Sequence, residues 1–362
     1  MNGVHHFVPV LHHGDAVGRH TLRLRDASRS RGLESHIYVD TIEPDTAGET
    51  RPVLSYPEAA RPGDVVVYQF ATASAMAPWL AGRPEILVVN YHNITPPELM
   101  APWDNHLALG QLRAQGDLRL LAPRAALAVA DSAYNEAHLA EAGFVRTAVI
   151  APSANLDGVG AAGAVTADRP ERTDGAGARW LAVGRVSPNK ALESTVAALA
   201  VARAHGDPAA TLLVVGKPAT DSYAAALHRY VAELGLSGAV TFTGHASDAT
   251  VAAAYASADV LVVTSEHEGF CVPVVEAMSI GLPVVAFDQG ALPEVLGAAG
   301  ALVGDKDPYA LAAAIGALLG DAPRRDAMVE AGRRRLAELD LATAADRFVD
   351  LLLGLTQPAG SA

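Results

Sequence analysis

Residues 260–281, VLVVTSEHEGFCVPVVEAMSIG, decide how this chain folds. A continuous apolar run is followed by a short loop carrying Glu266, His267 and Glu268. Gly269 then allows close backbone approach, Pro273 suits the first helical position, and Gly281 suits the position after the last. The stretch therefore predicts a buried strand, an acidic loop and a helix whose N-terminus lies at the strand end.

This predicted helix start has a chemistry that fits a polar ligand. The backbone N–H groups of Phe270, Cys271 and Val272 lie where an anion or hydroxyl could accept from them. Glu268 and Glu276 stand eight residues apart, and a carboxylate can accept from two neighbouring sugar hydroxyls at once. The same two acids also fit as solvated residues favoured by the helix dipole, so their spacing leaves both interpretations open.

The rest of the chain repeats the alternation of strand and helix. Apolar runs without a polar face are typical of strands covered on both sides, and their alternation with helices predicts an α/β fold of two doubly wound parallel sheets. The strands are expected at residues 4–10, 35–39, 64–70, 86–91, 126–130, 148–151, 179–183, 210–215, 240–243, 260–264 and 283–287. The helices are expected at residues 16–31, 105–121, 133–142, 190–204, 223–234, 249–256, 273–280, 307–319, 323–339 and 342–353.

A change of composition predicts the domain boundary. Residues 152–178 are rich in Gly, Ala, Asp and Pro and lack apolar periodicity. We expect a first Rossmann-like domain at 1–155, a linker at 156–178 and a second Rossmann-like domain at 179–340. Gly158, Gly160 and Gly163 spell GxGxxG inside the linker, but no strand precedes them and no helix follows, which argues against a dinucleotide loop.

Composition excludes several classes of function. The net charge of the 362 residues is −13, which disfavours a general nucleic-acid binder. Cys271 is the single cysteine, so an internal disulfide framework and a Cys-rich metal site are excluded, and a cytoplasmic location is predicted. The first 13 residues lack the pattern of a signal peptide, and no apolar run is long enough for a membrane span. The arginine-rich stretch 19–31 leaves peripheral contact with a membrane open.

Cations follow two of the predicted strands in the second half. Only three of the 27 basic residues are lysines, so each lysine stands out against the default use of arginine. Arg185 and Lys190 follow the strand 179–183, where a forked guanidinium and an ammonium suit a diphosphate. Lys217 also follows a strand, with a weaker argument. A surface loop with solvated cations is the alternative.

Two loops of the first half are further candidates. His92 leaves the strand 86–91 in NYHNITPP, which resembles a binding loop although a lone His is more often structural. Gly14, in LHHGDAVGRH, begins a strand-to-helix turn whose amides could face a phosphate. His12 and His13 have no matching second ligand set, so no metal site is predicted.

Taken together, these segments resemble retaining glycosyltransferases of family 4, in the group 1 glycosyltransferases. EGFCVPVVEAMSIGLPVVAFDQGALPEVLG (268–297) is similar to the family's Glu-x7-Glu signature, and GRVSPNK (184–190) to its Gly-Arg-x4-Lys phosphate clamp. FTGHAS (242–247) and ADSAYNEAHL (130–139) are similar to two further family segments. The resemblance implies a GT-B fold, with two Rossmann-like domains facing a central cleft and a final helix, about 341–362, that joins the first domain.

The resemblance also implies roles for individual residues. Arg185 and Lys190 would hold the donor diphosphate, Glu276 the ribose, and Glu268 the transferred sugar beside the amides of 269–272. His92 would contact that sugar near the reacting centre, and Gly14 would reach the diphosphate, although the family often has a second Gly where Asp15 stands. Lys217, Gly244 and His245 join the expected donor site. Cys271 is expected to pack rather than to react.

The function implied is transfer of a hexose, with retention, from GDP-mannose or a UDP-hexose to a hydroxyl acceptor. No metal or other cofactor is expected, because the cations and helix N-termini can stabilise the leaving diphosphate. The expected partners are a nucleotide sugar and a hydroxyl-bearing acceptor, such as a glycan, a glycolipid or a small molecule. A non-catalytic sugar-nucleotide-binding protein stays open, and a dinucleotide-dependent dehydrogenase is a weaker alternative.

Overall fold

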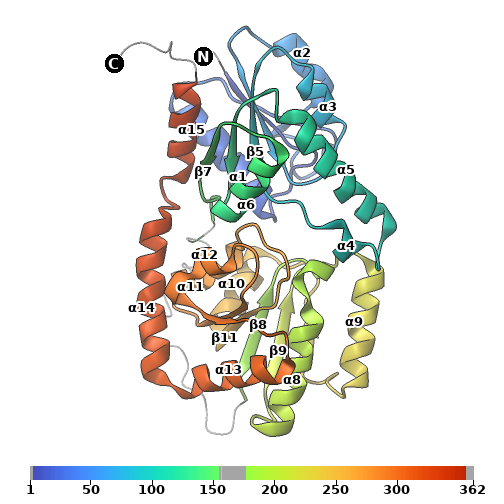
Figure 1. Cartoon of the computed structure of the whole chain (residues 1–362), viewed down its shortest axis with the longest axis vertical. Coiled ribbons are helices and arrows are strands. Elements are labelled where there is room, and N and C mark those ends of the chain that lie inside the picture. Colours follow the sequence, from blue (N-terminus) through green and yellow to red (C-terminus); the bar gives the residue numbers. More distant parts are fainter. Residues whose placement is uncertain (1–2, 155, 157–176, 356–362) are drawn as a thin grey trace. The chain divides into compact units, whose positions relative to one another are not determined.

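The computed structural model describes residues 3–154, 156 and 177–355, and the chain divides into two compact units (Figure 1). Unit 1 comprises residues 1–97, 106–154 and 340–362, and unit 2 comprises residues 98–105 and 155–339. Most of the predicted linker, 156–178, lies outside the described residues, as do Gly158, Gly160 and Gly163.

Unit 1 is built on a parallel sheet that has seven strands within the described residues, in the order β3-β2-β1-β4-β5-β6-β7. The direction of the order reverses at β1, which pairs with β2 on one side and β4 on the other. Ligands in open α/β sheets bind at the strand carboxyl ends beside such a reversal. The strands are β1 (Val4–Phe7), β2 (Ile37–Val39), β3 (Thr50–Pro52), β4 (Val65–Phe70), β5 (Ile86–Tyr91), β6 (Ala125–Ala130) and β7 (Thr147–Val149).

Helices cover both faces of the unit 1 sheet. On one face α1 (Ala16–Ser30) packs with the last helix, α15 (Ala344–Gly354), through Leu24 and Phe348. The other face is covered by α3 (Met76–Ala81), α5 (Asn105–Leu121) and α6 (Ala133–Ala142), which share one apolar core. The segments α2 (Tyr56–Ala59) and η1 (Val53–Ser55) complete the unit, and α4 (Pro97–Met100) begins the segment that belongs to unit 2.

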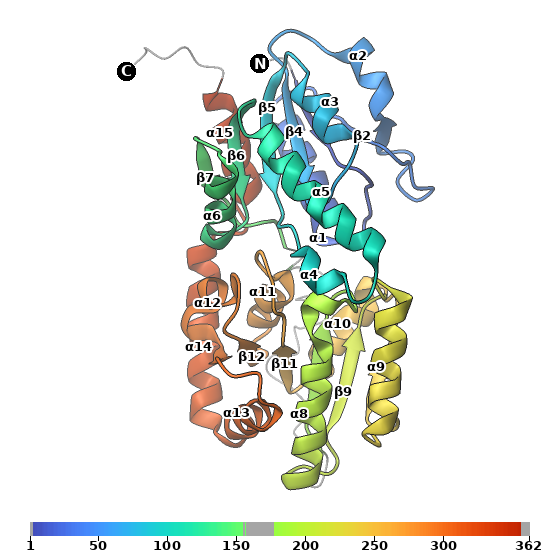
Figure 2. The ribbon, with the colours of Figure 1, turned by 45° about the vertical axis from the view of Figure 1, so that its right-hand side comes forward.

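Unit 2 repeats this plan around a second parallel sheet. Six strands of the described chain lie in the order β10-β9-β8-β11-β12-β13, and the order reverses at β8. In Figure 2, α8 and α9 run side by side along this sheet, and α8 also packs against α13. The strands are β8 (Arg179–Val183), β9 (Thr211–Val215), β10 (Val240–Phe242), β11 (Val260–Val263), β12 (Val284–Phe287) and β13 (Ala301–Val303). The helices are η2 (Pro188–Lys190), α8 (Leu192–His205), α9 (Asp221–Glu233), α10 (Asp248–Ser257), α11 (Val272–Ser279), α12 (Leu292–Leu296), η3 (Gly297–Ala299), α13 (Pro308–Gly320) and α14 (Ala322–Leu339).

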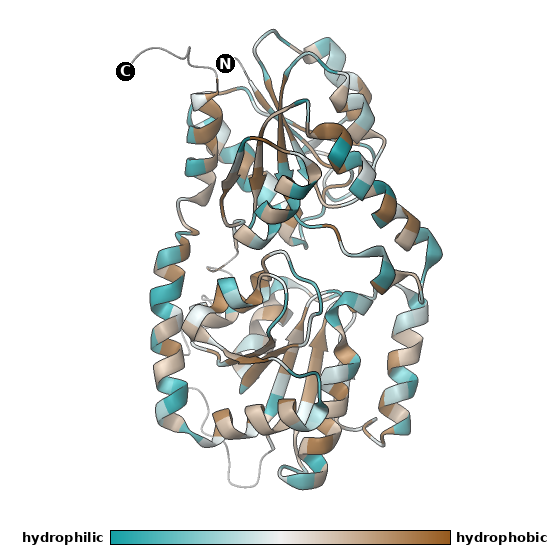
Figure 3. Ribbon diagram, in the orientation of Figure 1, coloured by the Kyte–Doolittle hydropathy of each residue, from teal (hydrophilic) through white to brown (hydrophobic). Residues whose placement is uncertain are grey.

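The central strands explain why the fold is layered in this way. In β4 all six side chains are buried, as are all four in β11 and in β12. Figure 3 shows β11 in the hydrophobic colour, whereas much of α14 is hydrophilic. A strand that is apolar on both faces is stable only when helices cover both, so the predicted α/β class is confirmed.

The observed elements differ from the predicted ones at several short segments. The strand predicted at 4–10 ends at Phe7, because Pro9 has no N–H to extend the ladder. The helix predicted from Lys190 begins at Leu192, because Ala191 has a φ of 44° and ends a separate 3-10 turn. The short strands β3 and β13 were not predicted. Residues 98–105 were expected in the first domain but belong to unit 2. There the ring centroids of Trp103 and Tyr223 lie 5.0 Å apart.

Candidate functional site

In unit 2, the loop after β8 carries the predicted phosphate clamp. A Cβ on Gly216 would lie 1.9 Å from the carbonyl oxygen of Gly184, so the ends of β8 and β9 approach each other more closely than any side chain permits. Gly184 and Gly216 also have φ values of 134° and 149°, which favour glycine. The glycine pair thus sets the path by which Arg185 leaves the sheet.

The far end of this loop is fixed by β11. The Thr264 hydroxyl, directly after β11, lies 3.0 Å from the carbonyl oxygens of both Lys190 and Ala191. The Lys190 N–H donates to Ser187 O at 2.9 Å, which closes the turn. The N-cap residue Ala191 gives α8 no side-chain cap, and the Leu192 N–H donates instead to the Tyr223 hydroxyl at 3.0 Å. The loop therefore presents Lys190 beside the helix start at the carboxyl end of β8, where Arg185 is exposed.

Lys190 and Glu268, which the sequence analysis assigned to different parts of the donor, are paired in the structure. The Lys190 ammonium contacts Glu268 Oε1, and Ser265 Oγ donates to the same oxygen at 2.6 Å. Their side chains are 20% and 10% exposed, so the pair is largely removed from water. Burial lowers the pKa of Lys190, but the Glu268 carboxylate more than offsets this, and the net shift is upward. Lys190 is therefore a firmly charged cation at the strand end.

The backbone of Glu268 is held by a turn that sequence reasoning did not single out. A Cβ on Gly290 would lie 2.7 Å from Glu268 O, and the φ of Gly290 is 59°. The Ala291 N–H donates to Glu268 O at 3.0 Å. The signal was present in FDQGALPEV, because a glycine in a short loop after a strand allows a close backbone approach.

Cys271 stands at the start of α11 in an unusual backbone conformation. It is the N-cap residue with φ and ψ both at 73°, and it gives α11 no side-chain cap. Its side chain lines a pocket together with Arg185 and Lys190. Burial raises the pKa of its thiol, and the nearby Glu268 raises it further. The thiol is therefore protonated at neutral pH, which fits the predicted packing role.

The second glutamate of the signature is anchored from a neighbouring helix. Glu276 is 5% exposed on α11, and the Tyr255 hydroxyl of α10 donates to its Oε2 at 2.8 Å. The same hydroxyl lies 3.3 Å from Pro273 O. Tyr255 therefore fixes both the α11 start and the Glu276 carboxylate, and no sequence motif indicated it. Of the other residues of the signature, Gly269 and Phe270 are buried and Val272 is half-buried.

Three other residues expected in the donor site lie on neighbouring strand ends. Gly244 has a φ of 67° and forms an antiparallel bridge with Gly216, so it belongs to the glycine-lined ends of β8, β9 and β10. Lys217 and His245 are exposed. The structure thus brings Arg185, Lys190, Glu268 and Cys271 together in unit 2 and leaves Lys217 and His245 at its surface.

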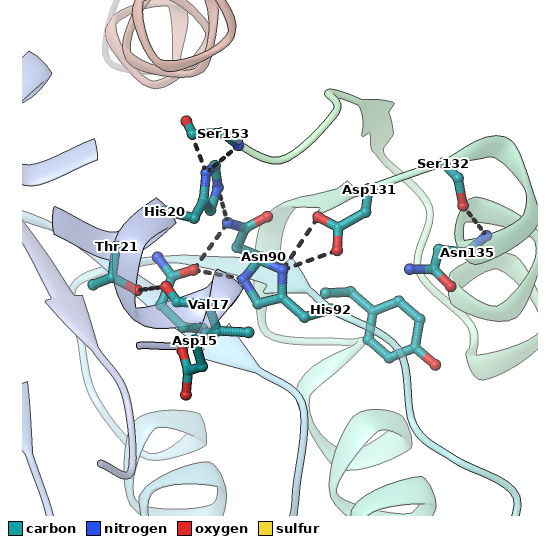
Figure 4. Close-up of polar contacts among 12 residues, drawn as sticks. Asp15, Val17, His20, Thr21, Asn90, His92, Asp131, Ser132, Asn135 and Ser153 are labelled. Carbon is teal, nitrogen blue, oxygen red and sulfur yellow. Dashed lines mark hydrogen bonds and ion pairs between the residues drawn. The ribbon is translucent and has the colours of Figure 1, made fainter. Parts of the chain in front are cut away.

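In unit 1, His92 lies directly after β5 and is held at both ring nitrogens. Its Nδ1 is 3.0 Å from Asp131 Oδ2, and its Nε2 is 2.8 Å from Gln69 Oε1. Figure 4 shows His92 facing Asp131, with Asn90, His20 and Ser153 continuing the polar chain. The His92 side chain is 3% exposed. The predicted sugar contact of His92 remains a prediction.

The turn at Gly14 differs from a free anion site. Gly14 is exposed, and Asp15 caps α1 by accepting from the Gly18 N–H at 2.6 Å. A Cβ on Gly18 would lie 1.9 Å from His12 O, so α1 starts tightly against this turn. Asp15 thus places a carboxylate at the helix start where a phosphate was expected.

The arginines offered to a membrane are largely engaged within unit 1. Arg25 pairs with Asp26 and Glu49, each at 2.8 Å. Arg31 lies 2.7 Å from Asp350 and 3.3 Å from Asp346.

Among the described residues, no three metal-ligating side chains are arranged to hold an ion. No helix in the described part of the chain is long and apolar enough to cross a membrane.

Comparisons with known proteins agree with this architecture. Residues 177–321 match the sequence model of the family described as glycosyl transferases group 1. The MMP alpha-(1->4)-mannosyltransferase of Mycolicibacterium hassiacum is 44% identical over 115 residues, which are 31% of this chain and 28% of that protein. A D-inositol 3-phosphate glycosyltransferase of Corynebacterium urealyticum is 27% identical over 319 residues, 78% of this chain and 74% of that protein.

Among solved structures, Anabaena HepE in complex with UDP and glucose has a TM-score of 0.76 at 20% identity, covering 98% of this chain and 100% of that one. This likeness shows the fold, which is GT-B, as predicted. Residues 177–321 of unit 2 thus resemble a group 1 glycosyltransferase domain, and the resemblance predicted from the sequence is confirmed for this part of the chain. The alignment spans less than a third of the length of the M. hassiacum relative.

Proposed function

We propose that this protein is a hexosyltransferase that moves a hexose from a nucleotide-diphosphate sugar to a hydroxyl acceptor. The observation that carries the proposal is the arrangement at the carboxyl ends of β8 and β11. Arg185 and Lys190 lie there beside Glu268 and the uncapped start of α11. Cations next to the start of a helix favour a diphosphate, and a nearby carboxylate favours the sugar hydroxyls attached to it.

The Lys190–Glu268 pair gives this site a way to couple binding to sugar recognition. Without ligand, each charge satisfies the other, which limits the cost of burying both. A diphosphate that binds Lys190 provides a new anionic partner, and the Glu268 carboxylate then becomes available to accept from sugar hydroxyls. Ser265, which donates to Glu268, can keep the carboxylate in place during this exchange.

The transfer step needs stabilisation of the charge that develops on the leaving diphosphate. Arg185, Lys190 and the N–H groups at the start of α11 supply it, and fixed donors of this kind act most strongly where water is excluded. We propose that the reaction retains the anomeric configuration and requires no metal. EDTA should therefore leave the rate unchanged, and loss of activity that magnesium or manganese restores would overturn this leaving-group chemistry.

The donor proposal rests on the relatives that match part of this chain. The M. hassiacum relative is a mannosyltransferase, which favours GDP-mannose, while a UDP-hexose is the second candidate. A thermal-shift series with GDP, UDP and their sugars separates the two. A ligand at 100 times its dissociation constant adds about 2.7 kcal/mol of stability.

A non-catalytic sugar-nucleotide-binding protein is the alternative that shares this site. Incubation with the stabilising donor distinguishes the two, because an enzyme releases free nucleotide diphosphate, slowly to water and faster with an acceptor. Tight donor binding with no release under either condition would overturn the proposed activity. The comparisons give no support to a dinucleotide-dependent dehydrogenase.

A further inference from the structure

A continuous chain of polar side chains runs through unit 1 from Ser153 to Asp131. His20, on α1, lies between Ser153 and Asn90, with Asn90 Nδ2 at 3.0 Å from His20 Nε2. Asn90 Nδ2 lies 2.9 Å from Gln69 Oε1, which is 2.8 Å from His92 Nε2. His20, Asn90 and Gln69 are each 1% exposed. Because water is excluded from these three side chains, each of their N–H groups must find its acceptor within this hydrogen-bonded network.

At the Ser153 end of this hydrogen-bonded network the donor is a backbone N–H group, which can only donate. The backbone N–H of Ser153 donates to His20 Nδ1 at 3.1 Å, so this nitrogen carries no proton. Burial lowers the pKa of His20 well below its usual value, and His92 and His6 lower it further, so the ring is neutral. A neutral imidazole keeps one proton, which must therefore be on Nε2 and point at Asn90.

This proton decides the orientation of both amides. An N–H on His20 cannot face the Asn90 NH₂ group, so the oxygen of Asn90 must occupy that position. That oxygen also faces Gln69, which must then present its NH₂ group. The two hydrogens of that group point at Asn90 and at His92 Nε2. Exchanging amide N and O keeps every heavy-atom distance, because the two atoms are nearly isosteric.

The position of the proton on His92, at the other end of the hydrogen-bonded network, is then determined. His92 Nε2 accepts from Gln69, so the ring proton lies on Nδ1 and is donated to the Asp131 carboxylate at 3.0–3.1 Å. On the side branch, the Gln69 oxygen faces His6 Nδ1 at 3.4 Å, which fits a neutral His6 protonated there. Burial lowers the pKa of His6 to about 3, in agreement with a neutral ring.

We propose that Gln69 and Asp131 are positioning residues that hold His92 as its Nδ1–H tautomer, with an unprotonated Nε2 that can accept from a substrate hydroxyl. The carboxylate fixes the tautomer and the ring orientation, as an acid beside a histidine commonly does. In the protein without substrate, the Gln69 NH₂ group donates to this Nε2. The use of His92 during transfer rests on the proposed function, whereas its tautomer does not.

The direct test is nitrogen NMR of the full chain labelled with ¹⁵N-histidine at neutral pH. Signals of His92 are assigned by their loss in His92→Gln. We expect a protonated Nδ1 and an unprotonated Nε2 for His92, and the reverse for His20. A protonated Nε2 on His92, in either the other tautomer or the cation, would overturn the proposal.

Two matched amide-to-acid changes sharpen this test. In Asn90→Asp an oxygen still faces His20 and Gln69, so the protonation of His92 should stay as in the wild type. In Gln69→Glu the donor to His92 is lost and a carboxylate faces Nε2, so His92 should take up a second proton. The opposite pattern, with His92 altered by Asn90→Asp and unaltered by Gln69→Glu, would contradict the assigned amide orientations.

Kinetics then separates positioning from mere structural support. Gln69→Glu should lower kcat by about tenfold or more while the affinity for free nucleotide diphosphate, a unit 2 property, stays unchanged. Asp45→Asn, an exposed change in the same unit, is the control. A His92 that gains the proton with no change in kcat would overturn the role of Nε2. If no donor supports transfer in the wild type, the proposed function fails while the NMR result stands by itself.

Discussion

The loops after β1 and after β8 occupy equivalent places in the two units but differ in charge. Both strands lie where the strand order reverses, and each loop leads into the next α-helix along the chain. In unit 1, Asp15 caps α1 through the Gly18 N–H. In unit 2, the N-cap residue Ala191 gives α8 no side-chain cap, the Tyr223 hydroxyl accepts from the Leu192 N–H, and the loop carries Arg185 and Lys190.

The difference teaches which of two similar positions can take an anion. A carboxylate at a helix N-terminus satisfies a backbone donor and repels a second negative charge. The unit 2 loop instead carries cations, one of which is kept charged by Glu268, while the first amide of α8, Leu192 N–H, donates to the Tyr223 hydroxyl at 3.0 Å. The same doubly wound plan therefore places a carboxylate at the helix start in unit 1 and cations at the corresponding loop in unit 2, where we propose that the diphosphate binds.

The largest effect is expected from a substitution that disrupts the geometry of the unit 2 loop. Gly216→Ala places a Cβ 1.9 Å from Gly184 O at a φ of 149°, so the strand ends must separate. Backbone strain and overlap together should cost roughly 2–5 kcal/mol, measured by chemical unfolding. Gly238→Ala is the control, because nothing lies within 4 Å of its added Cβ. Equal stability of the two variants would show that the close strand approach is not required.

The next prediction separates the two glutamates by ligand. Glu276→Gln should weaken nucleotide diphosphate and intact donor alike, by about 1–3 kcal/mol, because both ligands contain the ribose. Glu268→Gln should weaken only the donor. It should leave the affinity for nucleotide diphosphate unchanged or higher, because Lys190 no longer has a competing carboxylate. Paired titrations check this, and equal losses for both ligands in Glu268→Gln would refute its sugar role.

The smallest effect is expected from changes to the capped start of α1 in unit 1. Asp15→Ala removes the cap of α1 and should cost about 0.5–2 kcal/mol of stability. Asp15→Ser keeps an N-cap oxygen without the charge and should stay near the wild type. Neither change should weaken nucleotide diphosphate binding, as calorimetry can show. A clear loss of binding in Asp15→Ser would instead place the diphosphate at α1.

The sequence predicted the α/β class and most central elements because buried parallel strands give long apolar runs. It missed β3 and β13, each three residues long, which carry too little pattern to be recognised. The candidate ligand-binding residues were found from strand-end motifs. Their supports, Tyr255, Gly290 and Gln69, were not found, because they meet the site only through tertiary contacts from other elements.

The central claim is that the β8 loop of unit 2 binds the donor diphosphate. The most direct test is calorimetric titration of the nucleotide diphosphate into Arg185→Ala and Lys190→Ala. Lys306→Ala, which removes an exposed lysine paired with Glu266, is the control. The claim predicts a loss of about 1.5–3 kcal/mol in each clamp variant, roughly tenfold to a hundredfold in affinity, and none in the control. Wild-type affinity in both clamp variants would contradict it.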